Sequence, residues 1–144
     1  MIIDTMYLFP LIGVDIKDDL LKAIYENRVK IKLSINDIKI NLISLFELQA
    51  KASKLNIPPK YVTRGLRVIL KRFDVIPFYR DDIIEVAHEV NKILRDYIDS
   101  IIISTGISLK ENLITQDSII IRNREILAEK YGVKIYRYED IATK

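Results

Sequence analysis

Residues 1–5 read Met-Ile-Ile-Asp-Thr, so a carboxylate and a hydroxyl stand directly behind two isoleucines. Apolar β-branched residues followed by polar ones are typical of a short buried strand and its exit. Asp4 is difficult to explain as a purely structural residue, because a carboxylate so close to a buried strand costs free energy without a partner. The exit of this first strand is therefore the candidate centre of a functional site.

Three further acids lie at the exit of an apolar strand-like run or in the first turn of the helix that follows: Glu47, Asp99 and Asp117. In an open parallel α/β sheet, the carboxyl ends of the strands form one binding crevice. Four carboxylates gathered there repel one another strongly unless cations neutralise them. A divalent cation held by carboxylates usually binds phosphate groups and assists their reactions. The four acids together therefore predict a site for metal-assisted phosphate chemistry.

Strand-like and helical segments alternate along the chain, which predicts βαβ units and a largely parallel sheet. Strands are expected at residues 2–3, 38–43, 74–78, 112–115 and 133–138. Helices are expected at residues 7–12, 15–27, 44–55, 58–72, 83–97, 100–110 and 123–131. Residues 29–43 leave two interpretations open, a hairpin that turns at Asn36-Asp37 or a loop that leads into one strand.

The bulk properties of the chain exclude several classes of protein. Its 144 residues suit one domain with one core, expected over residues 1–144. Cysteine is absent, which excludes disulfides, zinc–thiolate sites and thiol catalysis. No apolar stretch approaches bilayer length and no signal peptide is recognisable, so we expect a cytoplasmic protein with no membrane partner. A net charge of +3 permits a nucleic-acid partner without demanding one.

Four segments together resemble the PIN domain, the metal-dependent nuclease fold of VapC-type toxins: residues 2–5, 44–48, 99–102 and 113–117. Their order, their spacing and the length of the chain match that family, so the resemblance covers essentially the whole sequence. It implies an α/β protein with a three-layer αβα fold and a central, mostly parallel sheet of about five strands. Residues 29–40 depart from the family, because they are longer and more strand-like than the usual approach to the second strand.

The resemblance also implies a site and a function. The implied acidic quartet, which binds Mg²⁺ or Mn²⁺, is Asp4, Glu47, Asp99 and Asp117. The implied neighbouring hydroxyls, which orient ligands or waters, are Thr5, Ser44, Thr115 and Ser118. The implied activity is hydrolysis of RNA phosphodiesters by an endoribonuclease, the toxin of a toxin–antitoxin pair. Such a toxin is expected to form a homodimer and to be held inactive by a small antitoxin protein.

The helix expected at residues 58–72 carries four cations spaced by four, three and four residues: Lys60, Arg64, Arg67 and Lys71. This spacing places them on one face of the helix, opposite an apolar stripe. A row of cations suits the phosphate backbone of RNA, which is contacted without base reading. Lys51, one turn after Glu47, is also placed to reach a phosphate near the metal site. The simpler alternative is that the row is only a solvated helix face.

Each acid also has an ordinary structural explanation. Glu47 stands three residues after Ser44, which fits a capping box at a helix start. Asp99 fits a helix N-cap, and Asp96, one turn earlier, competes with it for the third acidic position. Asp117 fits a turn residue that follows a strand.

Two other functions remain as alternatives to the nuclease. One is a PIN-like module that binds RNA or protein without cutting. The other is a phosphoryl-accepting receiver domain, which places two acids after its first strand and a lysine after its fifth. Asp4 stands alone after the first strand here and no strand-end lysine matches, which argues against the receiver domain.

Overall fold

The computed structural model describes residues 1–143, which contain a five-stranded sheet with parallel pairings throughout. The strands are β1 (Ile2–Ile3), β2 (Lys39–Asn41), β3 (Asp74–Ile76), β4 (Leu113–Ile114) and β5 (Ile135–Tyr136). Their order in the sheet is β3-β2-β1-β4-β5, so the first strand lies in the middle. The expected three-layer α/β architecture is confirmed, and Asp4 leaves the sheet from its central strand.

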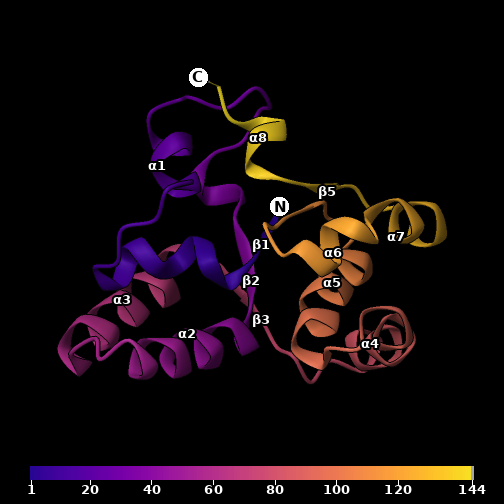
Figure 1. Cartoon of the computed structure of the whole chain (residues 1–144), viewed down its shortest axis with the longest axis horizontal. Coiled ribbons are helices and arrows are strands. Elements are labelled where there is room, and N and C mark those ends of the chain that lie inside the picture. The colour runs from indigo at the N-terminus through magenta and orange to yellow at the C-terminus, as the bar shows by residue number, and fades with distance from the viewer. Residues whose placement is uncertain (144) are drawn as a thin grey trace.

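Helices cover both faces of the sheet. They are η1 (Thr5–Ile12, a 3₁₀ helix), α1 (Leu20–Tyr25), η2 (Ile35–Asp37, also 3₁₀), α2 (Leu42–Lys54), α3 (Pro59–Arg72), α4 (Asp81–Leu94), α5 (Tyr97–Leu109), α6 (Ser118–Arg122), α7 (Arg124–Tyr131) and α8 (Tyr138–Ile141). Figure 1 shows α1, α2 and α3 on one side of the strands and α4, α5, α6 and α7 on the other. Among residues 1–143, none of the helices has the length and apolarity that a membrane span requires.

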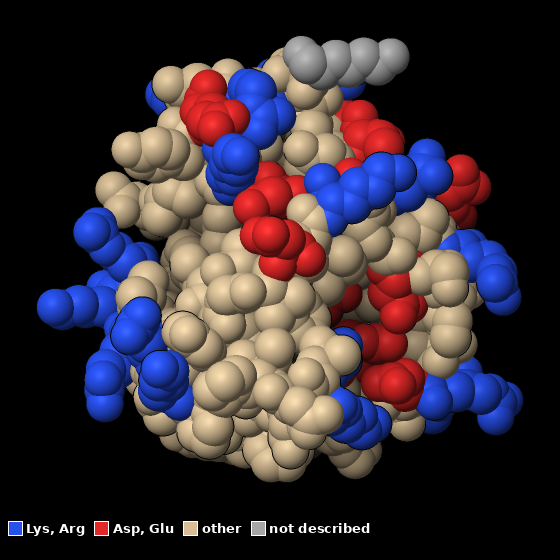
Figure 2. Space-filling view, turned by 60° about the vertical axis from the view of Figure 1, so that its left-hand side comes forward, with Lys and Arg blue, Asp and Glu red and all other residues tan. Residues whose placement is uncertain are grey.

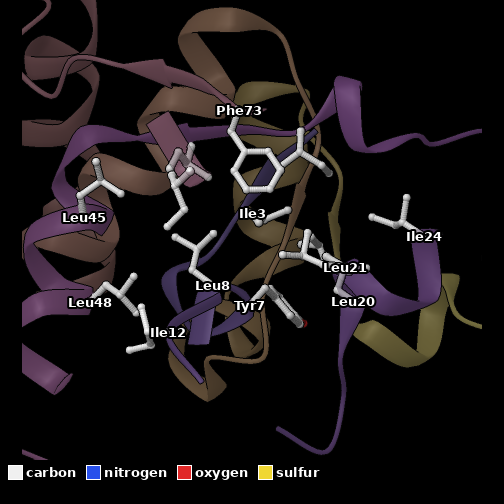
Figure 3. Packing of buried hydrophobic residues seen from close by; sticks show 14 of the residues in the cluster. Ile3, Tyr7, Leu8, Ile12, Leu20, Leu21, Ile24, Leu45, Leu48 and Phe73 are labelled. Carbon is white, nitrogen blue, oxygen red and sulfur yellow. The ribbon is translucent and has the colours of Figure 1, made fainter. Parts of the chain in front are cut away.

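The alternation of side chains along the strands divides the core between the two faces. Ile3 and Ile114 join the cluster beneath η1, α1, α2 and α3, and Figure 3 shows side chains meeting there around Ile3 and Leu8. Ile2 and Leu113 join the cluster on the opposite face, which α4, α5 and α7 cover. Each fully buried isoleucine or leucine contributes about 1.5–3 kcal/mol, so the short strands are anchored by burial on both faces.

The close approach of α3 to η1 helps to fix the chain that leaves β1. Gly65 of α3 faces Leu11 and Ile12 at the end of η1. A Cβ at this position would stand 2.6 Å from both the Leu11 carbonyl oxygen and Ile12 Cγ2, so only glycine allows the two helices to touch here. The segment that begins with Asp4 and Thr5 is thereby held between the sheet and α3.

Several sequence-based boundaries were wrong. The helix expected at residues 15–27 is shorter, because Asp19 accepts a hydrogen bond from Lys22 N and starts α1 at Leu20. Of the two interpretations of residues 29–43, the loop is confirmed: it contains η2 and leads into β2. Ser44 does not start the next helix, because Asn41 caps it through a 2.9 Å bond from Ile43 N. The capping-box explanation of Glu47 therefore fails.

Candidate active site

A cavity of about 310 Å³ opens at the carboxyl edge of the sheet. Its wall holds all four acids of the expected quartet: Asp4, Glu47, Asp99 and Asp117. Asp96, Lys51 and Gln116 line the same cavity. Figure 2 shows acidic side chains gathered inside a hollow on one face of the molecule. The structure thus brings together four carboxylates that are far apart in the sequence.

Asp4 is the most buried of these acids and is held by two donors. Its side chain is 9% exposed. Oδ1 accepts a 2.7 Å hydrogen bond from Thr5 N, and Oδ2 accepts a 2.5 Å bond from the Thr115 hydroxyl. Burial raises the pKa of Asp4, and the bonds from Thr115 and Thr5 oppose that rise because they stabilise the ionised form. The carboxylate is therefore fixed in orientation.

Asp99 lies in the first turn of α5, and Asp96, not Asp99, is the N-cap of this helix. The Asp96 side chain caps the helix by accepting a 3.0 Å bond from Asp99 N, and Arg95 before it adopts a left-handed backbone with φ of 57°. Burial, followed by the nearby charges of Asp117 and Asp4, raises the pKa of Asp99 to about 7. A shift of this kind is expected where carboxylates crowd together without a cation.

Asp117 combines a structural role with its place on the cavity wall. It is the N-cap of α6, and its Oδ1 accepts hydrogen bonds of 2.9 Å from Ile119 N and 3.0 Å from Ile120 N. The interpretation of Asp117 as a turn residue after a strand is therefore wrong about the turn, because Asp117 follows β4 but begins a helix. The cap uses one carboxylate oxygen and fixes the rotamer, so the other oxygen has a defined direction.

Glu47 lies in the second turn of α2 beside Lys51, the one lysine that lines the cavity among residues 1–143. Lys51, one turn later, brings its ammonium within 3.9 Å of Glu47 Oε2. The Lys51 side chain is about half exposed, and an ion pair of this kind is worth only about 0–1 kcal/mol. The pair therefore contributes little stability, but it holds one positive charge at the rim of an acidic cavity.

The four expected hydroxyls are placed differently from one another. Thr115 bonds to Asp4 and also accepts a 3.0 Å hydrogen bond from Asp117 N, so it connects two of the acids. The hydroxyls of Thr5 and Ser44 are buried and have no hydrogen-bond partner within residues 1–143. Ser118 is the exposed first residue of α6. None of the four is part of the cavity wall in the described chain.

The donor set fits a hard divalent cation. Within residues 1–143, no three acidic or histidine side chains stand close enough to hold a metal ion as they are placed. Mg²⁺ does not require such a cage, because it keeps several waters and binds through one or two carboxylates. The wall offers carboxylate oxygens. Burial raises the pKa of Asp99 first and the neighbouring carboxylates raise it further, and a cation would relieve that second contribution.

The basic row of α3 lies away from this cavity. Its four members are all exposed: Lys60, Arg64, Arg67 and Lys71. Two of them lie near the Tyr61 ring, with Lys60 Nζ at 5.2 Å and Arg64 Cζ at 5.8 Å from its centroid. Figure 2 shows basic side chains gathered on the side of the molecule away from the acidic hollow. Lys51 is the one cation of the proposed set that reaches the cavity wall.

Met6 and Gln116 also line the wall, and neither is a site residue that the sequence predicts; Gln116 is the polar one. It stands between Thr115 and Asp117, inside a segment that was recognised, so its position was the available signal. Its amide contacts Asp18 and Glu139, which come from opposite ends of the chain. No local pattern marks these two acids, because only the fold brings them beside Gln116.

Comparisons with known proteins agree with the fold. The family model described as PIN domain matches residues 1–126. No curated protein matches. A toxin–antitoxin complex from Klebsiella pneumoniae is similar at 22% identity and a TM-score of 0.58, over 81% of this chain and 86% of that chain. FitAcB from Neisseria gonorrhoeae is similar at 16% identity and a TM-score of 0.66, over 96% and 97% of the two chains. VapBC2 from Rickettsia felis, bound to a promoter DNA fragment, is similar at 20% identity and a TM-score of 0.61, over 94% and 96%.

Proposed function

We propose a function from one premise: this chain belongs to the PIN domain family. Nuclease activity is the general function of that family. We infer that this chain is a divalent-metal-dependent endoribonuclease that hydrolyses RNA phosphodiesters. The observation that carries the proposal is the convergence on one cavity of four acids from four separate segments, Asp4, Glu47, Asp99 and Asp117.

The four acids take different roles in this proposal. A bound Mg²⁺ or Mn²⁺ supplies charge neutralisation at the phosphoryl oxygens and an activated water. Asp4 is the central ligand, because it leaves the middle strand and both of its oxygens are oriented by donors. Asp99 and Asp117 complete the metal site from the facing helices. Glu47 acts through water and holds the proton that the attacking water releases.

The hydroxyls and cations support this chemistry. Thr115 orients Asp4 and the backbone of Asp117. Thr5 follows Asp4 directly and Ser44 lies three residues before Glu47, and both hydroxyls are buried behind the cavity wall. Ser118 stands exposed at the start of α6, next to Asp117. Lys51 contacts an RNA phosphate at the rim of the acidic cavity. The α3 row holds a more distant part of the RNA backbone: Lys60, Arg64, Arg67 and Lys71.

The experiment is cleavage of a pool of labelled RNAs, including structured tRNA, in Mn²⁺, Mg²⁺ or EDTA. Asp4→Asn is run beside the wild type, and Asp15→Asn, an exposed loop acid, serves as a charge-matched control. Cleavage that needs metal, persists in Asp15→Asn and disappears in Asp4→Asn supports the proposal. Equal cleavage by Asp4→Asn would show that the assignment of the metal site is wrong. No cleavage together with no Mn²⁺ binding by calorimetry would favour a non-cleaving binding module.

We also propose that the chain acts as a toxin with a small antitoxin as its partner and with a second copy of itself in a homodimer. The support is the likeness of its fold to a structure described as a toxin–antitoxin complex. A basic side chain of the antitoxin would fit the acidic cavity. The test is growth arrest on expression, relieved by the product of a short neighbouring gene. Cleavage without growth arrest would remove the toxin role and keep the nuclease.

A further inference from the structure

The acidic cavity contains a positive charge of its own. Lys51 and Glu47 both belong to the cavity wall, and Lys51 Nζ lies 3.9 Å from Glu47 Oε2. The two residues are one turn apart on α2, so the helix directs the ammonium and the carboxylate to the same side. The side chain of Lys51 is 47% exposed and that of Glu47 is 17% exposed, so the pair extends from the rim into the cavity. Among residues 1–143, no other lysine or arginine lines this wall.

The sheet places this pair on one side of Asp4 and Asp117 on the other. Helix α2 begins directly after β2, which is one neighbour of the central strand β1. Asp117 follows β4, which is the other neighbour of β1. Asp4, at the exit of β1, therefore lies between a part of the wall that holds a lysine and a part whose charged groups are acidic.

The pKa shifts agree with this division. Burial raises the pKa of Asp4 most, two hydrogen bonds lower it, and the charges of Glu47 and Lys51 then act in opposite directions. For Asp99, burial and then four neighbouring carboxylates all raise the pKa. Lys51 thus offsets the charge of Glu47, whereas the charges that act most on Asp99 are all negative.

We propose that Lys51 is a built-in cation that takes the place of a second metal ion, so the acidic cavity binds a single divalent ion beside Asp4, Asp99 and Asp117. This inference rests on the proposed function, because it assumes that the cavity binds divalent metal. It goes beyond that function because it assigns the number of ions and gives Lys51 a part in the reaction.

The charge of Lys51 disfavours a second ion on its side of the cavity. Nucleases that use two metal ions hold them about 4 Å apart, and each ion needs carboxylate ligands. Glu47 is the carboxylate that would serve a second ion, but it already has the Lys51 ammonium beside it. A divalent ion brought to Glu47 would be repelled by this ammonium, and the repulsion is stronger inside a cavity than in bulk water.

The ammonium can supply the charge that a second ion would supply. It carries three hydrogen-bond donors and no acceptor, which suits a non-bridging phosphoryl oxygen of RNA. In this role Lys51 keeps its proton and stabilises negative charge that develops on the phosphoryl group. Because α2 holds this charge in place, we expect cleavage to depend on metal concentration as a process that needs one ion.

The test is calorimetric titration of Mn²⁺ into the protein without RNA. The variants are Lys51→Met, which keeps an unbranched stem and removes the charge, and Lys51→Arg, which keeps the charge. Lys54→Met is the control, because Lys54 is an exposed lysine of the same helix that does not line the cavity in the described chain.

We expect one Mn²⁺ per chain in the wild type, in Lys51→Arg and in Lys54→Met. Lys51→Met should bind two, and the first should bind about three- to tenfold more tightly because the acids lose their internal cation. Adding Glu47→Gln to Lys51→Met should return the number to one, because it removes the carboxylate that the second ion would use. Two ions or none in the wild type, or one ion in Lys51→Met, would overturn the inference.

Cleavage of labelled RNA over a range of Mg²⁺ concentrations separates this inference from the proposed function. The wild type should respond with a Hill coefficient of about one, and Lys51→Met should respond with a coefficient near two and a lower maximal rate. The expected Mn²⁺ numbers without any cleavage would refute the nuclease and leave the role of Lys51 as a built-in cation standing. Cleavage by a wild type that binds two ions would do the reverse.

Discussion

The Thr115 hydroxyl donates a 2.5 Å hydrogen bond to Asp4 Oδ2 across 111 positions of sequence. The same hydroxyl accepts a 3.0 Å bond from Asp117 N, so one side chain sets the position of two acids on the wall. The exits of neighbouring strands β1 and β4 are thereby connected. This arrangement resembles the outer partners of metal sites, which orient ligands without touching the ion.

Replacement of Thr115 by valine tests this arrangement, because valine has nearly the same shape and lacks the hydroxyl. The bond from Thr115 lowers the pKa of Asp4, so its loss should favour the protonated acid and weaken cation binding. We expect Mn²⁺ affinity to fall about 10–100-fold, as measured by calorimetry. Thr63→Val is the control, because that exposed hydroxyl donates only to the Lys60 carbonyl. Unchanged affinity in Thr115→Val would contradict a positioning role.

The raised pKa of Asp99 predicts how stability depends on pH when metal is absent. The pKa of Asp99 is about 7 in the folded protein, against an ordinary value of 3.8, so the folded state binds more protons between these values. Stability should therefore fall as pH rises through this window, because the slope follows the difference in bound protons. Since Asp99 is partly exposed, solvent screening reduces the effect to about 1–3 kcal/mol.

The measurement is urea unfolding in EDTA at pH 5 and pH 8. Asp99→Asn should remove much of the difference between the two values, whereas Asp15→Asn should preserve it. Added Mg²⁺ should restore stability at pH 8 in the wild type, because it replaces the proton as the neutralising charge. A wild type that is equally stable at both pH values would contradict the raised pKa of Asp99.

The parts of the site that the sequence predicts are those that follow a buried strand. Asp4 and Asp117 could be found because consecutive apolar residues mark β1 and β4, and the first few residues after a parallel strand lie at the binding edge. The parallel sheet itself could be predicted for the same reason, since alternating strand and helix patterns leave few other topologies.

The features that were missed depend on tertiary contacts. The break between α4 and α5 occurs at Arg95, whose positive φ has no sequence signature, so the helix was expected to run to Tyr97. Asn41 caps α2 directly at the end of β2, with no loop between them, and the pattern Ser44-x-x-Glu47 suggested a later start. The contact of Gln116 with Glu139 requires the whole sheet to be assembled.

Asn41 should be important for stability because it performs two roles while completely buried. Its Oδ1 caps α2, and its Nδ2 donates a 2.8 Å hydrogen bond to the Thr105 hydroxyl of α5. Asn41→Ala removes the cap and the bridge together, which we expect to cost about 2–4 kcal/mol in the free energy of unfolding. Asn36→Ala, at an exposed position, should change it by less than about 0.5 kcal/mol in the same urea titration. Similar values for the two variants would contradict the double role of Asn41.

The α3 row should contribute to RNA affinity through charge alone. Replacing Arg64 and Arg67 by glutamine removes two exposed cations from one helix face without touching the acidic cavity. We expect weaker binding of a long RNA, and a plot of log affinity against log salt whose slope is smaller by about 1.5–2. Catalysis on a short RNA that spans only the cavity should be unchanged, because the chemistry takes place at the acids.

The pair Lys30→Gln and Lys32→Gln removes the same charge from an exposed loop and is the control. An equal loss of affinity in both double variants would indicate a general effect of net charge and would contradict a specific RNA-binding face on α3.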